Sequence, residues 1–211
     1  MAKEGPSQSN DWSLCRTPAL LIGGAYSGKS SLASNFLKPD EKTCVVGTAD
    51  PKEPDFLPII TELKAKRPKH WRHFEDNENL SEMLGNIALT HKQVLFDSIN
   101  QWVAARLLKS SGIYSPAQIE DHLLYETSQI IKAIRSHPNT RFILVTNEVS
   151  SGMVPPKPLP QLFRQLLTKI NCKIAEICLT VTTMTAGIPF VIKGEPLGQP
   201  VQPNPHKHSL L

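Results

Sequence analysis

The sequence predicts an α/β fold built on a mainly parallel β-sheet, and three observations support this prediction. Short apolar runs recur along the 211 residues, segments with a helical spacing of apolar residues separate them, and glycine or polar residues follow their ends. Parallel strands need a long crossover between them, so this alternation is typical of a sheet with helices on both faces. We expect about seven strands flanked by helices, with an antiparallel hairpin at the carboxyl-terminal end.

The first part of the expected domain alternates strands with helices. Leu20–Ile22 is an apolar strand that ends in two glycines, and Ser30–Leu37 follows it as a helix. Thr43–Gly47 contains two adjacent valines, which favour a strand. Asp55–Lys66 has apolar residues at helical spacing and begins with a residue type that commonly caps helices, and Arg72–Glu75 is a short strand.

The middle part continues the same alternation. Leu80–Thr90 has apolar residues at helical spacing, and Val94–Asp97 is an apolar strand that ends in a carboxylate. Ile99–Lys109 and Pro116–Ser136 are helices by the same spacing, and Phe142–Val145 is another apolar strand.

The last part of the expected domain runs from a proline-rich stretch to the hairpin. Four prolines between Pro155 and Pro160 predict a stiff loop, and Leu159–Ala175 follows as a helix. Ile177–Met184 is rich in β-branched residues and reads as a strand. Gly187 turns the chain, so that Pro189–Ile192 returns as an antiparallel partner.

Composition and charge restrict the class of protein. Hydrophobic residues make up 40% and charged residues 20% of the chain, which excludes general disorder. The net charge of +4 suits a phosphate-bearing ligand, but no run of Lys and Arg reaches five residues, so we expect no nucleic-acid partner. No apolar run approaches the roughly 18 residues of a membrane span, and the first residues lack a secretory signal. The four cysteines form no C-x-x-C pair, so we expect reduced thiols in a cytoplasmic protein.

The expected domain covers residues 18–194 and lies between two less ordered ends. Residues 1–17 are polar and are expected to form a loose arm, and residues 195–211 are expected to form a proline-rich tail. The central length fits one domain of roughly 100–200 residues.

The clearest motif is the glycine-rich loop Gly23-Gly24-Ala25-Tyr26-Ser27-Gly28-Lys29-Ser30, which fits G-x-x-x-x-G-K-[ST] at every fixed position. It follows an expected strand and precedes an expected helix, which is the context that a phosphate-binding loop requires. Glycines let backbone N–H groups approach a polyphosphate, because no Cβ atom blocks them. Lys29 is expected to reach the β- and γ-phosphates, and the Ser30 hydroxyl is a hard oxygen ligand for Mg²⁺.

A carboxylate at the end of a neighbouring strand commonly works with such a loop, and Asp97 ends the strand Val94–Asp97. Asp97 is therefore a candidate to hold Mg²⁺, directly or through water, and it could equally cap the helix that follows, or do both.

Other polar residues are weaker candidates. Glu148 follows the apolar strand Phe142–Val145, where it could act as a base, accept hydrogen bonds in a pocket or lie in solvent. His70 and His73 flank Trp71 and Arg72 and are candidate catalytic groups, although most lone histidines are structural or exposed. A basic set could grip a phosphate or form a solvated face: Lys64, Lys66, Arg67, Lys69 and Arg72.

Taken together, these motifs resemble the bifunctional adenosylcobinamide kinase / adenosylcobinamide-phosphate guanylyltransferase family of cobalamin biosynthesis. The resemblance covers roughly Leu20 to Lys193 and rests on five stretches in order. They are the loop Gly23–Ser30; Arg67–Arg72 with Glu75; Val94–Asp97; Leu144–Val149 with Gly152–Pro155; and Phe163-Arg164, Asn171 and Ala186–Pro189. The stretch around Asn147-Glu148-Val149 is far more specific to the family than the glycine-rich loop, which many nucleotide-binding proteins share.

The resemblance implies a P-loop, RecA-like domain, commonly assembled as a trimer. It also implies that ATP or GTP with Mg²⁺ phosphorylates the aminopropanol hydroxyl of adenosylcobinamide, and that GMP then passes from GTP to this phosphate through a GMP–histidine intermediate. The nucleotide contacts that it implies are Gly23, Gly24, Ala25, Tyr26, Ser27, Gly28, Lys29, Ser30, Thr48, Ala49, Asp50, Lys64, Ala65, Lys66, Arg67, Glu75 and Asp97.

The sequence also departs from the family pattern. The family's nucleophilic histidine lies eight residues before the tryptophan that is Trp71 here, and this position is Leu63. A leucine has no lone pair and cannot form a phosphoramidate. Further departures are Tyr26, His73, Ser150, Gln165 and Cys172.

Three interpretations of the chain follow from this pattern. The first is a kinase that has lost guanylyl transfer, and the second is a bifunctional enzyme in which His70 or His73 replaces the missing nucleophile. The third is a catalytically impaired protein that binds nucleotide or corrinoid as a sensor or regulatory partner.

Overall fold

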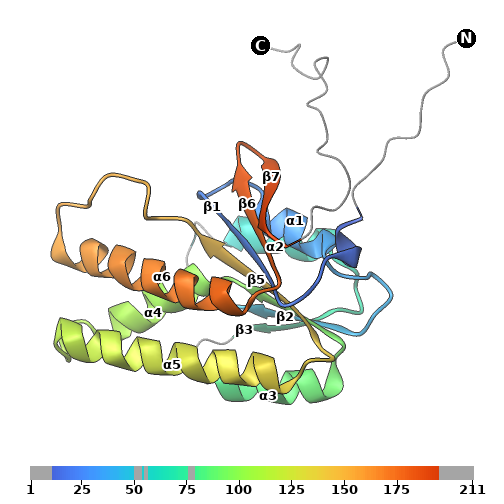
Figure 1. Ribbon diagram of the computed structural model, residues 1–211, viewed down its shortest axis with the longest axis horizontal. Helices are drawn as coiled ribbons and strands as arrows, with labels where there is room; N and C mark the ends of the chain where they lie inside the picture. Colours follow the sequence, from blue (N-terminus) through green and yellow to red (C-terminus); the bar gives the residue numbers. More distant parts are fainter. Residues whose placement is uncertain (1–10, 50–53, 55–56, 76–78, 195–211) are drawn as a thin grey trace, which may run out of the picture.

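The computed structural model describes residues 11–49, 54, 57–75 and 79–194. Within these residues the strands form a seven-stranded sheet with the order β3-β2-β4-β5-β1-β6-β7 (Figure 1). The strands are β1 (Ala19–Gly23), β2 (Thr43–Gly47), β3 (Arg72–Glu75), β4 (Gln93–Asp97), β5 (Arg141–Asn147), β6 (Thr180–Thr185) and β7 (Ile188–Lys193). The helices are η1 (Trp12–Leu14), α1 (Lys29–Asn35), α2 (Leu57–Lys66), α3 (Leu80–Thr90), α4 (Ile99–Ser110), α5 (Pro116–Ser136) and α6 (Pro158–Ile177).

The sheet is parallel from β3 to β6, and only β7 runs antiparallel to its neighbour. The predicted mainly parallel α/β fold with a carboxyl-terminal hairpin is confirmed. Because parallel strands point the same way, the ends of β1, β2, β4 and β5 meet at one edge of the sheet. The registers pair Gly23 with Asn147, Asp97 with Val145 and Gly47 with Asp97 across these strands.

Two hydrophobic layers cover the two faces of the sheet. The larger layer packs α3, α4, α5 and α6 against one face, and Val94 and Phe96 of β4 point into it. The smaller layer holds Leu95 of the same strand together with residues of η1 and α1. Alternate residues of one strand therefore enter different cores, which is why the strands are apolar at consecutive positions. Among the described residues, no helix is both long enough and apolar enough to cross a membrane.

The amino-terminal segment differs from the expected loose arm. From residue 11 onward it packs on the domain, because Trp12 is buried and its ring stacks on Phe36 with centroids 4.9 Å apart. Arg141 anchors the segment by donating from Nη2 to the Cys15 carbonyl at 2.7 Å and from Nε to the Phe36 carbonyl at 2.8 Å. The rest of the expected arm, and the expected tail over residues 195–211, lie outside the described residues.

The boundary between α6 and β6 also differs from the prediction. The strand was expected from Ile177, but Ile177 ends α6 and β6 begins at Thr180. Ile170 and Ile174 are buried at helical spacing and extend the apolar stripe of the helix to this point, so packing of α6 on the sheet outweighs the β-branched composition. Pro158, expected in a loop, is the first residue of α6, where proline needs no N–H donor.

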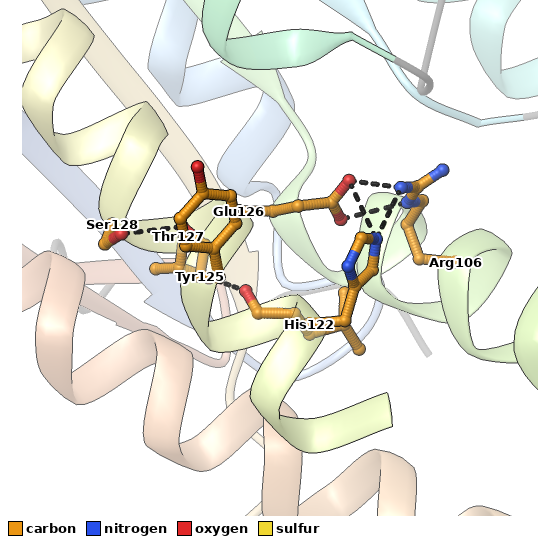
Figure 2. Close-up of polar contacts among 7 residues, drawn as sticks. Arg106, His122, Tyr125, Glu126, Thr127 and Ser128 are labelled. Carbon is orange, nitrogen blue, oxygen red and sulfur yellow. Dashed lines mark hydrogen bonds and ion pairs between the residues drawn. The ribbon is translucent and has the colours of Figure 1, made fainter. Parts of the chain in front are cut away.

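An ion-pair cluster joins α4 to α5 on the helical side of the sheet. Arg106 of α4 donates from Nε to Glu126 Oε2 at 3.0 Å and also bonds Glu126 Oε1 through Nη2. Figure 2 shows the imidazole of His122, one turn earlier on α5, in contact with both the Glu126 carboxylate and the Arg106 guanidinium. The amino-terminal end of α5 carries a reciprocal cap between Ser115 and Gln118.

Candidate functional site

The glycine-rich loop connects β1 to α1 at the carboxyl edge of the sheet, as the motif predicts. Gly28 precedes the first helical residue and has a φ of 88°, in the left-handed region that glycine adopts without a steric penalty. A Cβ atom on Gly23 would lie 2.5 Å from the Met184 carbonyl oxygen, so no larger residue fits beside β6. Glycine is therefore required at both positions by the backbone itself.

Lys29 lies buried under this loop. Its Nζ donates to the Gly24 carbonyl at 2.6 Å and to the Ser27 hydroxyl at 3.3 Å. Burial lowers the pKa of Lys29 to about 8, although the nearby Asp97 carboxylate opposes the shift. Among the described residues the ammonium group thus has only neutral hydrogen-bond partners, and an anionic phosphate would be a better one.

Asp97 is the centre of a second set of contacts at the end of β4. Its Oδ1 accepts from the Ser30 hydroxyl at 2.9 Å, and its Oδ2 accepts from Arg67 Nη2 at 3.0 Å. Arg67 Nε also donates to the Ser34 hydroxyl of α1 at 3.3 Å. The Asp97 and Arg67 side chains are only 11% and 5% exposed, so this ion pair is largely withdrawn from water.

The residues present fit a bound Mg²⁺. A hydroxyl oxygen and a carboxylate oxygen lie 2.9 Å apart beside a phosphate-binding loop. Mg²⁺ commonly takes one or two protein oxygens and completes its shell with water and substrate phosphates. The described residues contain no group of three or more His, Cys, Asp or Glu side chains that could hold a metal by themselves. The donor set is therefore suited to a metal that arrives with a nucleotide.

The loop borders a cavity of about 410 Å³ at the carboxyl edge of the sheet. One wall is the loop itself, from Ala25 to Ser31, and another is α2 with Ile59, Glu62 and Leu63. The remaining wall comes from the ends of β4 and β5 and the start of α4: Ser98, Asn100, Val145 and Asn147. A second cavity of about 450 Å³ lies on the other side of the loop, between α1 and the β6–β7 hairpin.

The two candidate histidines lie in different surroundings. His73 lines a small cavity of about 50 Å³ together with Leu63, Arg67 and Asp97. Burial, followed by the charges of Arg67 and Lys64, lowers the pKa of His73, although Glu75 opposes this. His70 is exposed on the turn before β3 and is not among the residues that line this cavity. The structure thus brings His73, and not His70, next to the Asp97 cluster.

The residues of the predicted basic set also lie in different surroundings. Arg67 alone contacts Asp97, whereas Lys64 pairs with Glu75 and Lys66 pairs with Glu62. Lys69 and Arg72 are exposed. Among the expected nucleotide contacts beyond the loop, Thr48 is buried and donates its hydroxyl to the Ser98 carbonyl at 2.5 Å. Ala65 is exposed on α2, Ala49 lines the small cavity, and Asp50 lies outside the described residues.

Glu148 is tied into its own loop. One carboxylate oxygen accepts from the Ser150 amide at 2.7 Å and from its hydroxyl, and the other accepts from the Ser151 amide and hydroxyl at 3.2 and 2.6 Å. Partial burial raises the pKa of Glu148, but these hydrogen bonds outweigh it and lower the pKa to about 2. A carboxylate of this kind is a poor general base near neutral pH.

Side chains of α6 form hydrogen bonds with the end of β5 and the loop after it. Asn171 accepts from the Thr146 hydroxyl at 2.8 Å and donates to the Asn147 carbonyl at 3.0 Å. Arg164 donates to the Ser150 carbonyl of the following loop. The carboxyl-terminal motif residues therefore position the strand end that borders the phosphate-binding loop.

Comparison with known proteins shows the family of the chain. The model of the CobU family, described as cobinamide kinase / cobinamide phosphate guanyltransferase, matches residues 19–192. The chain belongs to this family. It is 32% identical to the bifunctional adenosylcobalamin biosynthesis protein CobP of Pseudomonas aeruginosa over 179 residues, which covers 84% of this chain and 98% of that protein. It is 27% identical to the bifunctional adenosylcobalamin biosynthesis protein CobU of Escherichia coli, over 82% of this chain and 98% of that protein.

Solved structures give more distant matches. The RadB recombinase aligns with a TM-score of 0.44 and 17% identity, over 85% of this chain and 82% of that chain. The P-loop fold itself follows from the glycine-rich loop between β1 and α1 and from the strand order of the sheet.

Sequence reasoning missed one polar residue that lies in the site of this CobU-family chain. Asn100 follows Asp97 by three residues and lines the cavity beside the phosphate-binding loop. It is only 7% exposed, and within the described part of the chain its Oδ1 has no hydrogen-bond partner. The signal in the sequence was weak, because Asn is also a common polar residue in the first turn of a helix.

Proposed function

We propose that this CobU-family protein is a kinase that uses ATP or GTP with Mg²⁺ to phosphorylate the hydroxyl of adenosylcobinamide. The observation that carries the proposal is the joint placement of Lys29, Ser30 and Asp97 beside a cavity at the carboxyl edge of the sheet. Phosphoryl transfer depends on positioning and on neutralising charge, and it needs no covalent bond to the protein. The loss of the family histidine at Leu63 therefore leaves this reaction intact.

The residues take the following roles in this proposal. The backbone from Gly23 to Ser30 cradles the phosphates, and Lys29 exchanges its bonds to Gly24 and Ser27 for β- and γ-phosphate oxygens. Ser30 and Asp97 hold Mg²⁺, which supplies charge neutralisation of the phosphates when bound. Arg67 balances the charge of Asp97 and adds a second cation to the site. The further nucleotide contacts at Thr48, Ala49, Asp50, Lys64, Ala65, Lys66 and Glu75 are proposed from the family resemblance alone.

The test of kinase activity uses adenosylcobinamide with γ-labelled ATP or GTP. We expect label transfer to the corrinoid that depends on Mg²⁺ and is lost in Lys29→Ala. Nucleotide binding without any transfer of label above background would instead support the third interpretation, a binding or regulatory protein. Unchanged nucleotide affinity in Lys29→Ala would show that the glycine-rich loop is not the site.

A second activity, guanylyl transfer, is favoured by one observation. His73 lines the same small cavity as Leu63, and burial lowers its pKa, which favours the neutral imidazole. A nucleophilic imidazole has to be neutral, because the protonated ring has no free lone pair. His73 is thus the better substitute for the missing nucleophile, and exposed His70 is the weaker one.

Incubation with α-labelled GTP separates the two activities. A kinase without guanylyl transfer gives no acid-labile labelled protein, whereas Leu63→His, which restores a histidine at the family position, gives a labelled adduct. An adduct on the unaltered chain that disappears in His73→Ala but not in His70→Ala would assign the transferase step to His73. An adduct lost only in His70→Ala would contradict the geometric argument.

The assembly and location of the protein are proposed from the family resemblance. We expect a homo-oligomer, a trimer by that resemblance, in the cytoplasm, with a corrinoid as the acceptor substrate. Analytical ultracentrifugation of the full chain tests the trimer, and a monomer at all accessible concentrations contradicts it.

A further inference from the structure

The side chain of Asn100 lies at the first turn of α4, where it lines the cavity beside the phosphate-binding loop. It is 7% exposed, and its Oδ1 is closed off from solvent and has no hydrogen-bond partner among the described residues, so this oxygen faces a ligand in the cavity only once the amide has rotated. A buried amide oxygen that makes no hydrogen bond costs stability, because folding removes its water without replacement. The fold therefore keeps a polar group at Asn100 at a cost that no contact among the described residues offsets.

The position of Asn100 in the cavity indicates which ligand it serves. Lys29, Ser30 and the loop backbone make up the phosphate side, whereas Ser98, Asn100, Val145 and Asn147 make up the wall at the strand ends. In phosphoryl transfer the attacking and leaving oxygens lie roughly in line on opposite sides of the transferred group. If the loop holds the leaving side, the acceptor hydroxyl has to approach from another wall of the cavity.

The chemistry of a carboxamide suits this task. It accepts a hydrogen bond through its oxygen and donates through its nitrogen. Rotation of the amide group by 180° about the Cβ–Cγ bond exchanges the positions of the oxygen and the nitrogen. An alcohol needs an acceptor for its proton and can use a donor for its oxygen. Glu62, the carboxylate that lines this cavity from α2, pairs with Lys66, and Glu148 after β5 is occupied by Ser150 and Ser151.

We propose that Asn100 is a positioning residue that hydrogen-bonds the hydroxyl of the acceptor substrate and orients it toward the terminal phosphate. The proposal rests on the proposed kinase function and adds the residue that recognises the acceptor. Asn147 lines the same wall at the end of β5 and is the second amide within this part of the cavity. Asn100 does not take the hydroxyl proton, because a neutral amide does not titrate near neutral pH. The proton would pass to an oxygen of the transferred phosphoryl group as the bond to the β-phosphate oxygen breaks, and Asn100 fixes geometry only.

The test compares Asn100→Ala with Gln101→Ala, which truncates an amide one residue further along α4 outside the lining of this cavity. At saturating ATP, Asn100→Ala raises the KM for adenosylcobinamide about tenfold or more, which is the loss expected for one buried hydrogen bond. Its Kd for nucleotide stays within about twofold of the unaltered protein. Gln101→Ala changes neither quantity.

A stability measurement separates positioning from a structural role. Asn100→Leu keeps a similar volume and removes the unpaired oxygen, so its melting temperature is expected to equal or exceed that of the unaltered protein. A large loss of melting temperature in both Asn100 variants, with nucleotide and acceptor binding reduced alike, would overturn the proposal. An unchanged KM in Asn100→Ala would overturn it as well.

The proposal can fail separately from the kinase function. If the unaltered chain shows no turnover, equilibrium dialysis with adenosylcobinamide and a non-hydrolysable ATP analogue still measures acceptor binding. Weaker corrinoid binding in Asn100→Ala than in Gln101→Ala then supports the assignment, and equal binding in both overturns it.

Discussion

Two arginine–carboxylate pairs in this chain have similar chemistry and different surroundings. Arg106 and Glu126 join α4 to α5 through two hydrogen bonds, and the pair is 17% and 19% exposed. Arg67 and Asp97 meet at the end of β4 through one hydrogen bond, and the pair is 5% and 11% exposed. Asp97 shares its other oxygen with Ser30, whereas Glu126 shares its carboxylate with His122 on the surface (Figure 2).

The difference separates an ion pair that only stabilises the fold from one whose contacts a ligand can replace. The Arg106–Glu126 pair uses both carboxylate oxygens for one partner, so no ligand is needed to complete it. The Arg67–Asp97 pair is divided between a cation and a hydroxyl beside a phosphate-binding loop. A metal that arrives with a nucleotide can therefore take over part of these contacts, and we infer that the second pair belongs to the site and the first to the scaffold.

The largest expected difference is in nucleotide binding. Asp97→Asn removes the proposed metal ligand and leaves Arg67 without its counter-charge, so the affinity for Mg²⁺–nucleotide is expected to fall on the order of 100-fold. Glu126→Gln is the matched change in the scaffold pair and leaves the affinity unchanged. Fluorescence titration with a labelled nucleotide measures both, and equal effects of the two changes would remove the distinction.

The next difference is in the stability of the nucleotide-free protein. Double-mutant cycles with Arg→Met and acid→amide changes are expected to give a coupling energy of about 2–3 kcal/mol for Arg67–Asp97 and about 1 kcal/mol for Arg106–Glu126. The more buried pair couples more strongly because water screens it less. Urea unfolding measures the four variants of each cycle, and the reverse order of the two energies contradicts the assignment.

Part of this comparison was accessible from the sequence, and part was not. The motif and the acidic strand end placed Lys29, Ser30 and Asp97 at one edge of the sheet, because parallel strands bring their carboxyl ends together. Which cation of the basic set turns inward is decided by tertiary contacts, those of Arg67 with Ser34 and Asp97, so the sequence does not distinguish Arg67 from Lys64 or Lys66. The hydrogen bonds that occupy Glu148, and the unpaired oxygen of Asn100, likewise depend on tertiary contacts that no local pattern encodes.

The core and the amino-terminal segment likewise differ in how well the sequence predicts them. The two core layers follow from consecutive apolar residues in the strands, and these elements were predicted closely. Trp12 was assigned to a loose arm because its polar neighbours dominate the local composition, yet its stacking on Phe36 orders the segment. The ring contact of Trp12 and the hydrogen bond from Arg141 to the Cys15 carbonyl thus outweigh the polar composition of the segment around them.

A smaller effect is expected in the proton uptake that accompanies nucleotide binding near Lys29. Its pKa of about 8 in the empty protein should rise when phosphates bind, so nucleotide binding at pH 8 takes up roughly half a proton. Calorimetry in buffers with different ionisation enthalpies measures this uptake. Binding without proton uptake near pH 8 would show that the ammonium does not meet the phosphates.

The same shift predicts the pH dependence of stability. The folded pKa of Lys29 lies below its usual value of 10.5, so between about pH 8 and 10.5 the unfolded chain binds more protons than the folded one. The free energy of unfolding therefore gains a rising contribution over this range, and Lys29→Met removes it. Urea unfolding at pH 8 and 9.5 for both proteins measures this contribution; the same slope in both contradicts the burial of the charged group.

The smallest expected effect is at Glu148, next to the site but tied into its own loop. Its pKa of about 2 lies below the usual 4.5, so its stabilising contribution is complete above about pH 4.5 and is lost as the pH falls toward 2. Glu148→Gln should flatten the acid side of the stability curve, whereas Glu82→Gln, at an exposed position on α3, should not. Acid titrations followed by circular dichroism compare the two variants, and equal curves would contradict the hydrogen-bonded loop.

The most direct measurement is calorimetric titration of the full chain with ATP and with GTP in the presence of Mg²⁺. We expect saturable binding of at least one of the two nucleotides, its loss in Lys29→Ala, and its retention in Glu126→Gln. No heat from either nucleotide at millimolar concentration, or equal binding by the unaltered chain and Lys29→Ala, would contradict the assignment of the loop beside Asp97 as the nucleotide site.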